Sequence, residues 1–294
     1  MKEEEKRQYV ANRLLEHYNF LESKGYEIVC LMLQGSQNYD LDLYTEEYKS
    51  DIDSKAIVLP HFRDFVKSKQ PVSYTEVLDN NEHAEVKDIR VMFEMFRKMN
   101  ISYIELLFSD YIIINPKYED LILDLFRHRA RIAAFNKSQF VRCIHGMALE
   151  KRKALCHPYP ATADKIAEFG YDGKQLSHCV RLYYFLRDYK AGKSIAQAFK
   201  PAEKDYLINL KMQKDEKGNR LDVTDAIALA DEYCRIIQEM KDEMIAEFGD
   251  GVDGGVIDIL DEICYKASTT RSASQENSRR SMGRSSSRMR ETRS

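Results

Sequence analysis

The chain has 294 residues, of which 44% are hydrophobic and 32% are charged, and its formal net charge is −3. This length suits one large or two medium domains with ample apolar material for a core, which excludes a wholly disordered chain. The charge is uneven, because seven arginines and two glutamates give +5 from Ala267 to the end and leave −8 for the residues before it. We therefore expect an acidic folded body followed by a basic tail.

The six cysteines are scattered along the chain, and no two of them have the C-x-x-C spacing. That distribution is typical of reduced thiols in a cytosolic protein and not of a disulfide framework. The first residues do not resemble a signal peptide, and no apolar run approaches the roughly 20 residues of a membrane-spanning helix. We expect a cytoplasmic protein that does not contact the membrane.

The first half of the chain predicts a mixed α/β domain. Apolar residues at helical spacing, followed by Gly25, predict a helix over 10–21. Three short apolar runs are then typical of buried strands: 26–33, 52–59 and 84–87. Asp88 is placed to cap a helix over 89–99. The apolar segment 101–115 is expected to complete the sheet layer.

From Pro116 onward the apolar residues recur at a helical period. Six segments are interpreted as helices: 116–129, 137–155, 173–189, 202–212, 224–248 and 256–266. The segment beyond them is dominated by Ser, Arg and Thr and has too few apolar residues to fold alone. The predicted class is therefore α+β, with a small mixed β-sheet domain and flanking helices over 1–115. An all-helical domain follows over 116–266, and then a disordered Arg/Ser-rich tail over 267–294.

Two short motifs in the first domain indicate chemistry on phosphates. Gly35 and Ser36 follow the first predicted strand, and Asp51 and Asp53 open the second. Residues i and i+2 of a strand point to the same side, so the two carboxylates can act together. Nucleotidyl transfer uses two divalent ions roughly 3.5–4 Å apart, and hard ions such as Mg²⁺ require carboxylate oxygens. Gly35 lets the backbone approach phosphates closely, and the Ser36 hydroxyl can donate a hydrogen bond to them.

A third carboxylate is expected on the third strand, where it would complete the shell of one ion. Glu85 is the preferred residue, although glutamate is one methylene longer than aspartate and Mg²⁺ demands strict geometry. Asp88 and Glu76 are the alternatives, of which Asp88 is better explained as a helix N-cap.

The segments LQGSQNYDL (33–41) and SDID (50–53) resemble the DNA polymerase β-like nucleotidyltransferase superfamily. Within it, they are similar to the predicted bacterial and viral branch that includes RNA-repair-associated proteins. Further similarity lies at 83–90, 103–108 and 170–182, so the resemblance covers most of 30–190 and leaves the tail outside. It implies a small mixed sheet with a helical lobe, transfer of a nucleoside monophosphate from an NTP, and two Mg²⁺ or Mn²⁺ ions as cofactors. The sixteen positions between Gly35 and Asp51 are more than many members of the superfamily have.

Lys174, His178 and Arg181 fall at i, i+4 and i+7, on one face of a predicted helix. One interpretation is that this face meets the sheet domain and neutralises a bound triphosphate. The other is a solvated face with a buried histidine. Lys55 and Lys87 flank the acidic strands, where they would either contact phosphate or offset the carboxylates.

The sequence therefore predicts a metal-dependent nucleotidyltransferase that uses an NTP and releases pyrophosphate. The acceptor is a hydroxyl of an RNA end, a protein or a small molecule. One alternative is a catalytically inactive relative that binds a nucleotide or a partner, and the intact Asp51 and Asp53 argue against it. Another is an RNA-binding protein that acts through its basic tail, although the tail has no aromatic residue on which bases could stack.

Overall fold

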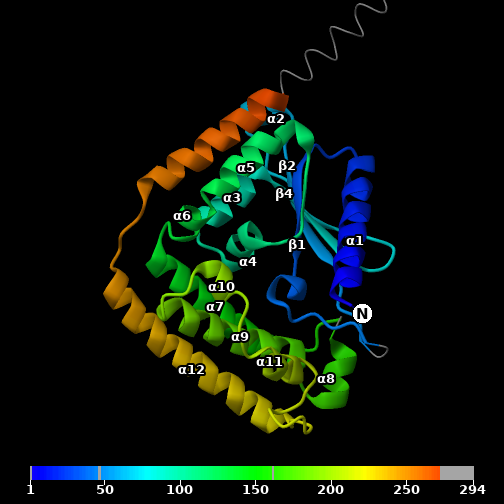
Figure 1. The fold of residues 1–294 in the computed structure, drawn as a ribbon, viewed down its shortest axis with the longest axis vertical. Helices are drawn as coiled ribbons and strands as arrows, with labels where there is room; N and C mark the ends of the chain where they lie inside the picture. The colour runs from blue at the N-terminus through cyan, green and yellow to red at the C-terminus, as the bar shows by residue number, and fades with distance from the viewer. Residues whose placement is uncertain (1, 46–47, 161, 272–294) are drawn as a thin grey trace, which may run out of the picture.

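The computed structural model describes residues 2–45, 48–160 and 162–271. A five-stranded sheet lies between a single helix on one side and a helical lobe on the other (Figure 1). Its strand order is β3-β4-β2-β1-β5, in which β2 and β4 are parallel and the other neighbours are antiparallel. The strands are β1 (Ile28–Gln34), β2 (Asp53–Val58), β3 (Ser73–Val77), β4 (His83–Asp88) and β5 (Ile112–Ile114). The predicted α+β class is confirmed.

The alternation of side chains along β2 separates two cores. Ser54, Ala56 and Val58 point toward α1 (Glu3–Ser23), where they join a core of apolar residues from α1, β1 and β4. Lys55 and Ile57 point toward the helical lobe. Asp53 lies on the same face as Lys55, so the acidic end of β2 opens toward the lobe.

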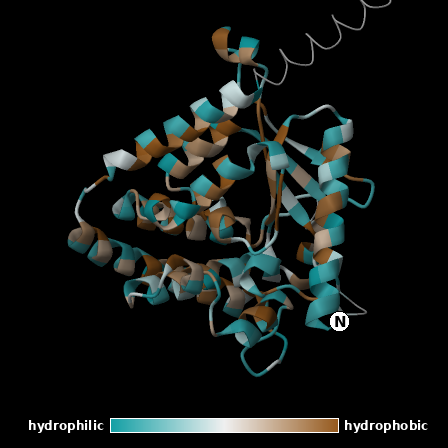
Figure 2. Cartoon of the chain, turned by 45° about the horizontal axis from the view of Figure 1, so that its top comes forward, coloured by the Kyte–Doolittle hydropathy of each residue, from teal (hydrophilic) through white to brown (hydrophobic). Residues whose placement is uncertain are grey.

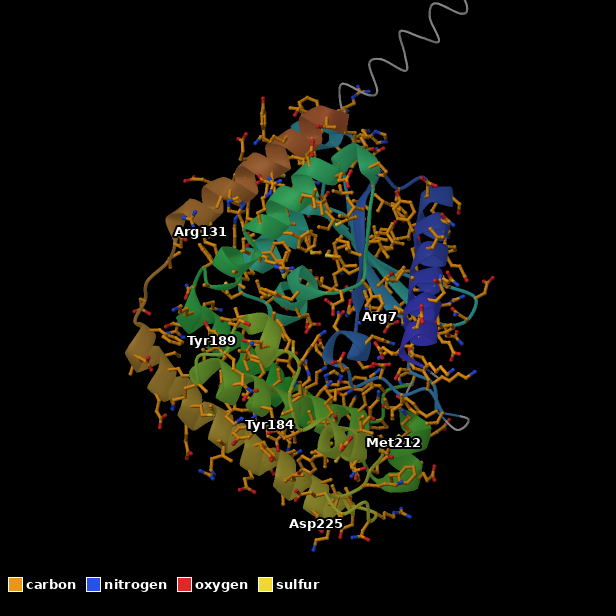
Figure 3. All side chains as sticks on the ribbon, in the orientation of Figure 1. Arg7, Arg131, Tyr184, Tyr189, Met212 and Asp225 are labelled. Atoms are coloured by element: carbon orange, nitrogen blue, oxygen red, sulfur yellow. The ribbon has the colours of Figure 1, made fainter. Side chains whose placement is uncertain are left out.

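The helical lobe and the helices next to the sheet form the larger core. Figure 2 marks the hydrophobic positions along these helices in brown, and Figure 3 shows side chains in the space between the ribbons, for example around Tyr189 of α9. The helices near the sheet are η1 (Ser36–Tyr39), α2 (Phe62–Val66), α3 (Ile89–Arg97), α4 (Ile101–Ile104), η2 (Glu105–Phe108), η3 (Pro116–Tyr118), α5 (Glu119–Arg127) and α6 (Arg129–Ala133). The others are α7 (Lys137–Ala154), α8 (Ala163–Phe169), α9 (Gly173–Lys190), α10 (Ile195–Ala198), α11 (Lys204–Lys211), α12 (Val223–Phe248) and a last helix at 254–271.

Most predicted elements are confirmed, including the cap at Asp88, whose carboxylate accepts from Arg90 N at 2.9 Å. The expectation for 101–115 is corrected, because α4 and η2 occupy most of that segment and only β5 joins the sheet. The predicted helix at 116–129 is divided into η3, α5 and α6. The last helix continues to Arg271, so the predicted tail boundary at 267 is too early. The rest of the predicted disordered tail, 272–294, lies outside the described residues.

In the ranges that the structure describes, no helix combines the length and the apolar composition needed to cross a membrane. All six cysteines are free thiols, as expected.

Candidate functional site

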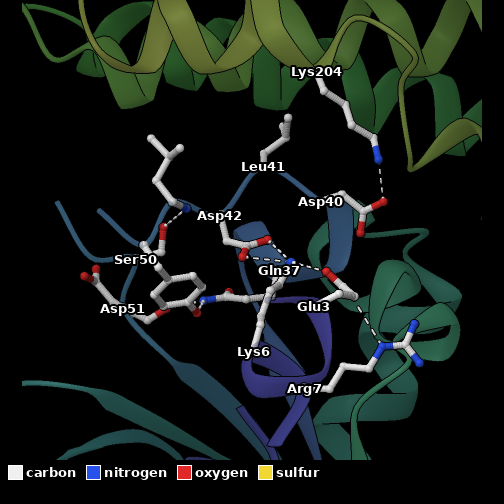
Figure 4. A network of polar contacts seen from close by, with 12 residues as sticks. Glu3, Lys6, Arg7, Gln37, Asp40, Leu41, Asp42, Ser50, Asp51 and Lys204 are labelled. Atoms are coloured by element: carbon white, nitrogen blue, oxygen red, sulfur yellow. Dashed lines mark hydrogen bonds and ion pairs between the residues drawn. The ribbon is translucent and has the colours of Figure 1, made fainter. Parts of the chain in front are cut away.

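The loop after β1 lies beside the acidic start of β2. In the antiparallel register of β1 and β2, Gln34 is opposite Asp53, so the chain enters the loop next to the acidic pair. Gly35 has φ +117°, a conformation that side chains with a Cβ rarely adopt. The Gln37 side-chain amide then donates to the backbone oxygen of Asp51 at 2.8 Å (Figure 4). This bond fixes the position of Asp51 relative to the loop.

The two aspartates differ in their surroundings. The Asp51 side chain is 59% exposed, and its Oδ2 lies 3.6 Å from Lys174 Nζ of α9. Asp53 is partly buried, and its Oδ1 accepts from the backbone N–H of His83 at 3.0 Å. Burial raises the pKa of Asp53 and the nearby Asp51 adds to this, while His83 and Lys174 act in the opposite direction. A cation at this end of β2 would relieve that unfavourable charge.

Glu85 is held by two lysines instead of joining the aspartates. It lies opposite Lys55 in the parallel register of β2 and β4, and its Oε2 is 3.0 Å from Lys55 Nζ and 3.2 Å from Lys87 Nζ. Burial alone would raise the pKa of Glu85, but these two ammonium groups outweigh it and lower the pKa. Among the described residues, no three Asp, Glu, His or Cys side chains come close enough together to hold a metal ion. The structure thus places Asp53 beside the loop and pairs Glu85 with the two lysines.

The two alternative third ligands have other partners. The carboxylate of Asp88 is buried, caps α3 and also binds the Arg90 side chain. Glu76 lies opposite Ala84 on the face of the sheet that α1 covers, and it accepts from the Tyr26 hydroxyl at 3.1 Å. Because of these contacts, neither Asp88 nor Glu76 is a better candidate than Glu85 for the third carboxylate.

The four predicted nucleotide-binding side chains share one cavity, which we call the cation pocket. It is lined by residues of α9, of α11 and of the loop at 35–41 after β1, which we call the phosphate loop. These residues are Ser36, Tyr39, Leu41, Lys174, Ser177, His178, Arg181 and Lys211. Its volume of about 20 Å³ is far below the roughly 300–1,000 Å³ of pockets that enclose a whole small-molecule ligand. In this ligand-free conformation the pocket has room for about one water molecule, so an anion would enter it only if the lining side chains moved apart.

Arg181 is the least satisfied residue of the cation pocket. Its side chain is buried, and the guanidinium carbon lies 3.7 Å from the centroid of the Tyr39 ring. Its Nε and Nη1 have no hydrogen-bond partner, although buried polar groups are nearly always paired. Glu105 lies near Arg181, and burial raises the pKa of Glu105 against the opposing influence of Arg181. An anion in the pocket would supply the missing acceptors.

The neighbouring basic side chains are disfavoured in their charged forms. Burial lowers the pKa of His178 well below its usual value, and Arg181, Lys151 and Lys174 lower it further. Burial likewise lowers the pKa of Lys151 on α7, with Arg181 as the next cause. Each charged lysine or arginine thus disfavours protonation of the basic groups beside it. A bound polyanion would favour their protonated forms.

A larger cavity lies on the other side of η1, between the start of α1 and α10–α11. Its lysines are already paired with carboxylates, and Figure 4 shows two of these contacts. The pairs are Lys6 with Asp42 at 2.9 Å, Lys200 with Asp110 at 2.6 Å and Lys204 with Asp40 at 2.7 Å. Because its charges are internally balanced, this cavity is less suited to a phosphate group than the smaller cation pocket.

The residues present fit a hard cation in part. Asp51 and Asp53 offer carboxylate oxygens at one edge of the sheet, beside a loop suited to phosphates, and Mg²⁺ is commonly held by one or two carboxylates plus substrate phosphates. Glu85 would join them only by giving up its contacts with Lys55 and Lys87.

The sequence did not single out Lys151, Tyr39 or Lys211 as site residues. Lys211 lines the cation pocket only through tertiary packing, and Tyr39 lines it as part of η1. No protein-family model, no curated protein and no solved structure matches the chain. The likeness to nucleotidyltransferases therefore rests on the motif residues of this chain and on where its fold places them.

Proposed function

We propose that this protein is a metal-dependent nucleotidyltransferase that moves a nucleoside monophosphate from an NTP to a hydroxyl acceptor. One observation supports this most strongly. Ser36 of the loop, the cations Lys174 and Arg181 and the imidazole of His178 line a single pocket, and Lys174 also reaches Asp51. Phosphate-binding groups and a pair of carboxylates thereby meet at one edge of the sheet.

The pocket would bind the triphosphate from both sides. The loop at Gly35 and Ser36 would contribute a hydroxyl and backbone N–H groups, while Lys174 and Arg181 would neutralise the phosphate oxygens. In the ligand-free protein, Lys174 and Asp51 neutralise each other at 3.6 Å. In the complex, Lys174 would turn to the phosphates and Asp51 would be left to hold a cation.

Asp51 and Asp53 would hold Mg²⁺ or Mn²⁺, which when bound supplies charge neutralisation for the triphosphate and favours the deprotonated acceptor. A second ion and Glu85 as its ligand remain predictions. The acceptor oxygen would attack the α-phosphorus, the bond between that phosphorus and the bridging oxygen to the β-phosphate would break, and pyrophosphate would leave with the electron pair. The acceptor proton would pass to solvent. The residues of this chain would contribute positioning and charge neutralisation.

The proposal is tested by incubating the protein with each α-³²P-labelled NTP and Mg²⁺, with and without total RNA or a protein acceptor mixture. We expect label to appear in an acceptor and pyrophosphate to be released. Asp53→Asn keeps the size of the side chain and removes its charge, so transfer should fall by several orders of magnitude. Its melting temperature should stay the same or rise slightly, because burial disfavours the charge of Asp53.

Asp258→Asn is the matched control, since Asp258 is exposed on the last helix and lies outside the site. It should leave transfer unchanged. Retention of transfer by Asp53→Asn would contradict the assignment of the acidic pair. Binding of Mg·ATP without transfer to any acceptor would instead support the catalytically inactive alternative.

A further inference from the structure

Lys211 is a cation of the site that belongs to no recognised motif. It is the last residue of α11, it is 8% exposed, and it lines the cation pocket together with Ser36 and Lys174. Its Nζ donates to Leu41 O at 3.1 Å and to Ser50 Oγ at 3.2 Å. Lys211 therefore connects the end of the phosphate loop to the residue before Asp51.

The position of Lys211 depends on a close approach of two helices. A Cβ on Gly173 would lie 2.5 Å from Leu210 O and 2.7 Å from Lys211 O, so only glycine allows the first turn of α9 to touch the end of α11. Lys174, the next residue of α9, thereby shares the pocket with Lys211. Two lysines from different helices thus line the same small space as the Ser36 hydroxyl.

The ammonium group of Lys211 has donor capacity left for a ligand. A lysine has three N–H donors, and hydrogen bonds to Leu41 and Ser50 use two of them. Its only aromatic neighbour among the cation–π contacts of the described residues is the Tyr48 ring, whose centroid is 5.1 Å away. The pocket around it also holds the two unpartnered guanidinium nitrogens of Arg181. Four N–H groups of the pocket are therefore without a hydrogen-bond acceptor: one on Lys211 Nζ, one on Arg181 Nε and two on Arg181 Nη1.

The charges around Lys211 come from several elements. Lys174 of α9 and Lys165 of α8 disfavour its positive charge, whereas Asp42 and Asp51 favour it. Burial is the largest influence, and together with Lys174 it lowers the pKa of Lys211 to about 8. A bound polyanion would oppose both influences and keep the lysine charged.

We propose that Lys211 is a further ligand of the triphosphate, which contacts a phosphate oxygen through its remaining N–H while it holds the loop and the segment before Asp51 in place. This inference rests on the proposed function, since it names an additional residue for the same phosphate site.

The test measures binding of Mg·ATP and of inorganic tripolyphosphate by isothermal titration calorimetry, which requires neither an acceptor nor catalysis. Lys211→Met should weaken both affinities by about tenfold, and Lys211→Arg should retain most of them. Lys214→Met is the matched control, because Lys214 is exposed three residues later and does not line the pocket. Should Lys211→Met fold poorly, Lys211→Gln offers a neutral side chain that can still donate to Leu41 and Ser50.

A second readout separates phosphate binding from a purely structural role. As the pH rises from 7 to 9, tripolyphosphate affinity of the wild type should fall more steeply than that of Lys211→Arg, because arginine stays charged. Equal affinities of wild type, Lys211→Met and Lys211→Gln would overturn the inference and leave the proposed function intact. Failure of the wild type to bind either ligand would refute both.

Discussion

Two groups of buried polar residues lie on opposite faces of β2, and they differ in how completely they are satisfied. Under α1, His17 Nδ1 lies 2.8 Å from Ser54 Oγ and His17 Nε2 lies 2.9 Å from Glu82 Oε2. Arg13 also binds Glu82, at 2.7 Å. On the other face, the cation pocket contains Arg181, two of whose nitrogens have no partner.

The α1 network (Arg13, His17, Ser54 and Glu82) is complete without any ligand. An ionised carboxylate only accepts hydrogen bonds, so His17 donates through Nε2 to Glu82 and, when neutral, accepts from Ser54 through Nδ1. Such a network stabilises the fold and fixes α1 on the sheet. In the cation pocket, two nitrogens of the buried Arg181 have no acceptor, so we infer that this charge is maintained for a ligand. Substitutions in the two groups should therefore have opposite effects on stability and binding.

The largest effect is expected for His17→Leu. Ser54 Oγ would lose its partner and Glu82 would keep only Arg13, and unpaired buried polar groups cost about 1–3 kcal/mol each. We expect the free energy of unfolding to fall by about 2–4 kcal/mol in urea denaturation, with Mg·ATP affinity unchanged well below the melting temperature. Unchanged stability with weakened ATP binding would reverse the roles of the two groups.

The second-largest effect is expected from acid, which should weaken the α1 network. Burial alone would raise the pKa of Glu82, but hydrogen bonds from His17 and Arg13 outweigh it and lower the pKa to about 2. A carboxyl with a lowered pKa contributes stability above its unfolded value of 4.5 and loses it as the pH falls toward 2. Urea denaturation at pH 5 and pH 3 should show this loss, up to about 3 kcal/mol over the full range. Glu82→Gln should reduce the pH dependence, and an unchanged slope would contradict the role of Glu82.

A third effect concerns the helix contact that closes the pocket. In Gly173→Ala the new Cβ would meet the backbone of Leu210 and Lys211, so the helices must separate at a cost of about 1–3 kcal/mol. Gly146→Ala is the matched control, because Gly146 lies within α7 and has open space for a Cβ. Alanine should stabilise that helix by roughly 0.5–1 kcal/mol. Thermal melts should thus shift in opposite directions, and equal shifts would exclude the close contact.

Elements with strong periodicity or a clear cap could be predicted, whereas the edge of the sheet could not. β3 is exposed along most of its length, so its sequence lacks the apolar alternation of a half-buried strand. The segment 101–115 is rich in apolar residues, and such a segment does not distinguish a buried strand from a buried helix. Asn100 decides this locally, since its side chain caps α4 by accepting from Ser102 N.

The candidate site likewise contains residues whose place the sequence predicts and residues whose place it does not. The sequence predicts that the loop at Ser36 and the acidic pair lie together, and the pairing of β1 with β2 places Gln34, next to this loop, opposite Asp53. The two lysines that bind Glu85 were noted as flanking residues, but which partner each would choose depends on the register of β2 and β4. Lys211 was not predictable, because its place depends on the contact at Gly173 between segments far apart in sequence.

Within the cation pocket, Arg181→Met should separate binding from folding. The variant removes a buried charge with two unpaired nitrogens, so its melting temperature should be unchanged or higher. Mg·ATP affinity should nevertheless fall by about 30-fold, roughly 2 kcal/mol, as measured by titration calorimetry. This is the opposite of the result for His17→Leu. A lower melting temperature with normal ATP affinity would show that Arg181 belongs to the structural core.

The smallest effect is expected for Lys174→Ala. Its side chain is 40% exposed and its contact with Asp51 is long, so solvent weakens what the charge contributes to stability. Melting should be unchanged, while the apparent KM for the NTP should rise about three- to tenfold with kcat largely retained, because a phosphate contact present throughout the reaction is uniform binding. Lys165→Ala, on the neighbouring α8, is the control and should leave KM within twofold, since Lys165 does not line the pocket. A fall in kcat without a change in KM would place Lys174 at the reacting phosphorus and not in ground-state binding. Equal KM values for both variants and the wild type would remove Lys174 from the site and leave Arg181 as its principal cation.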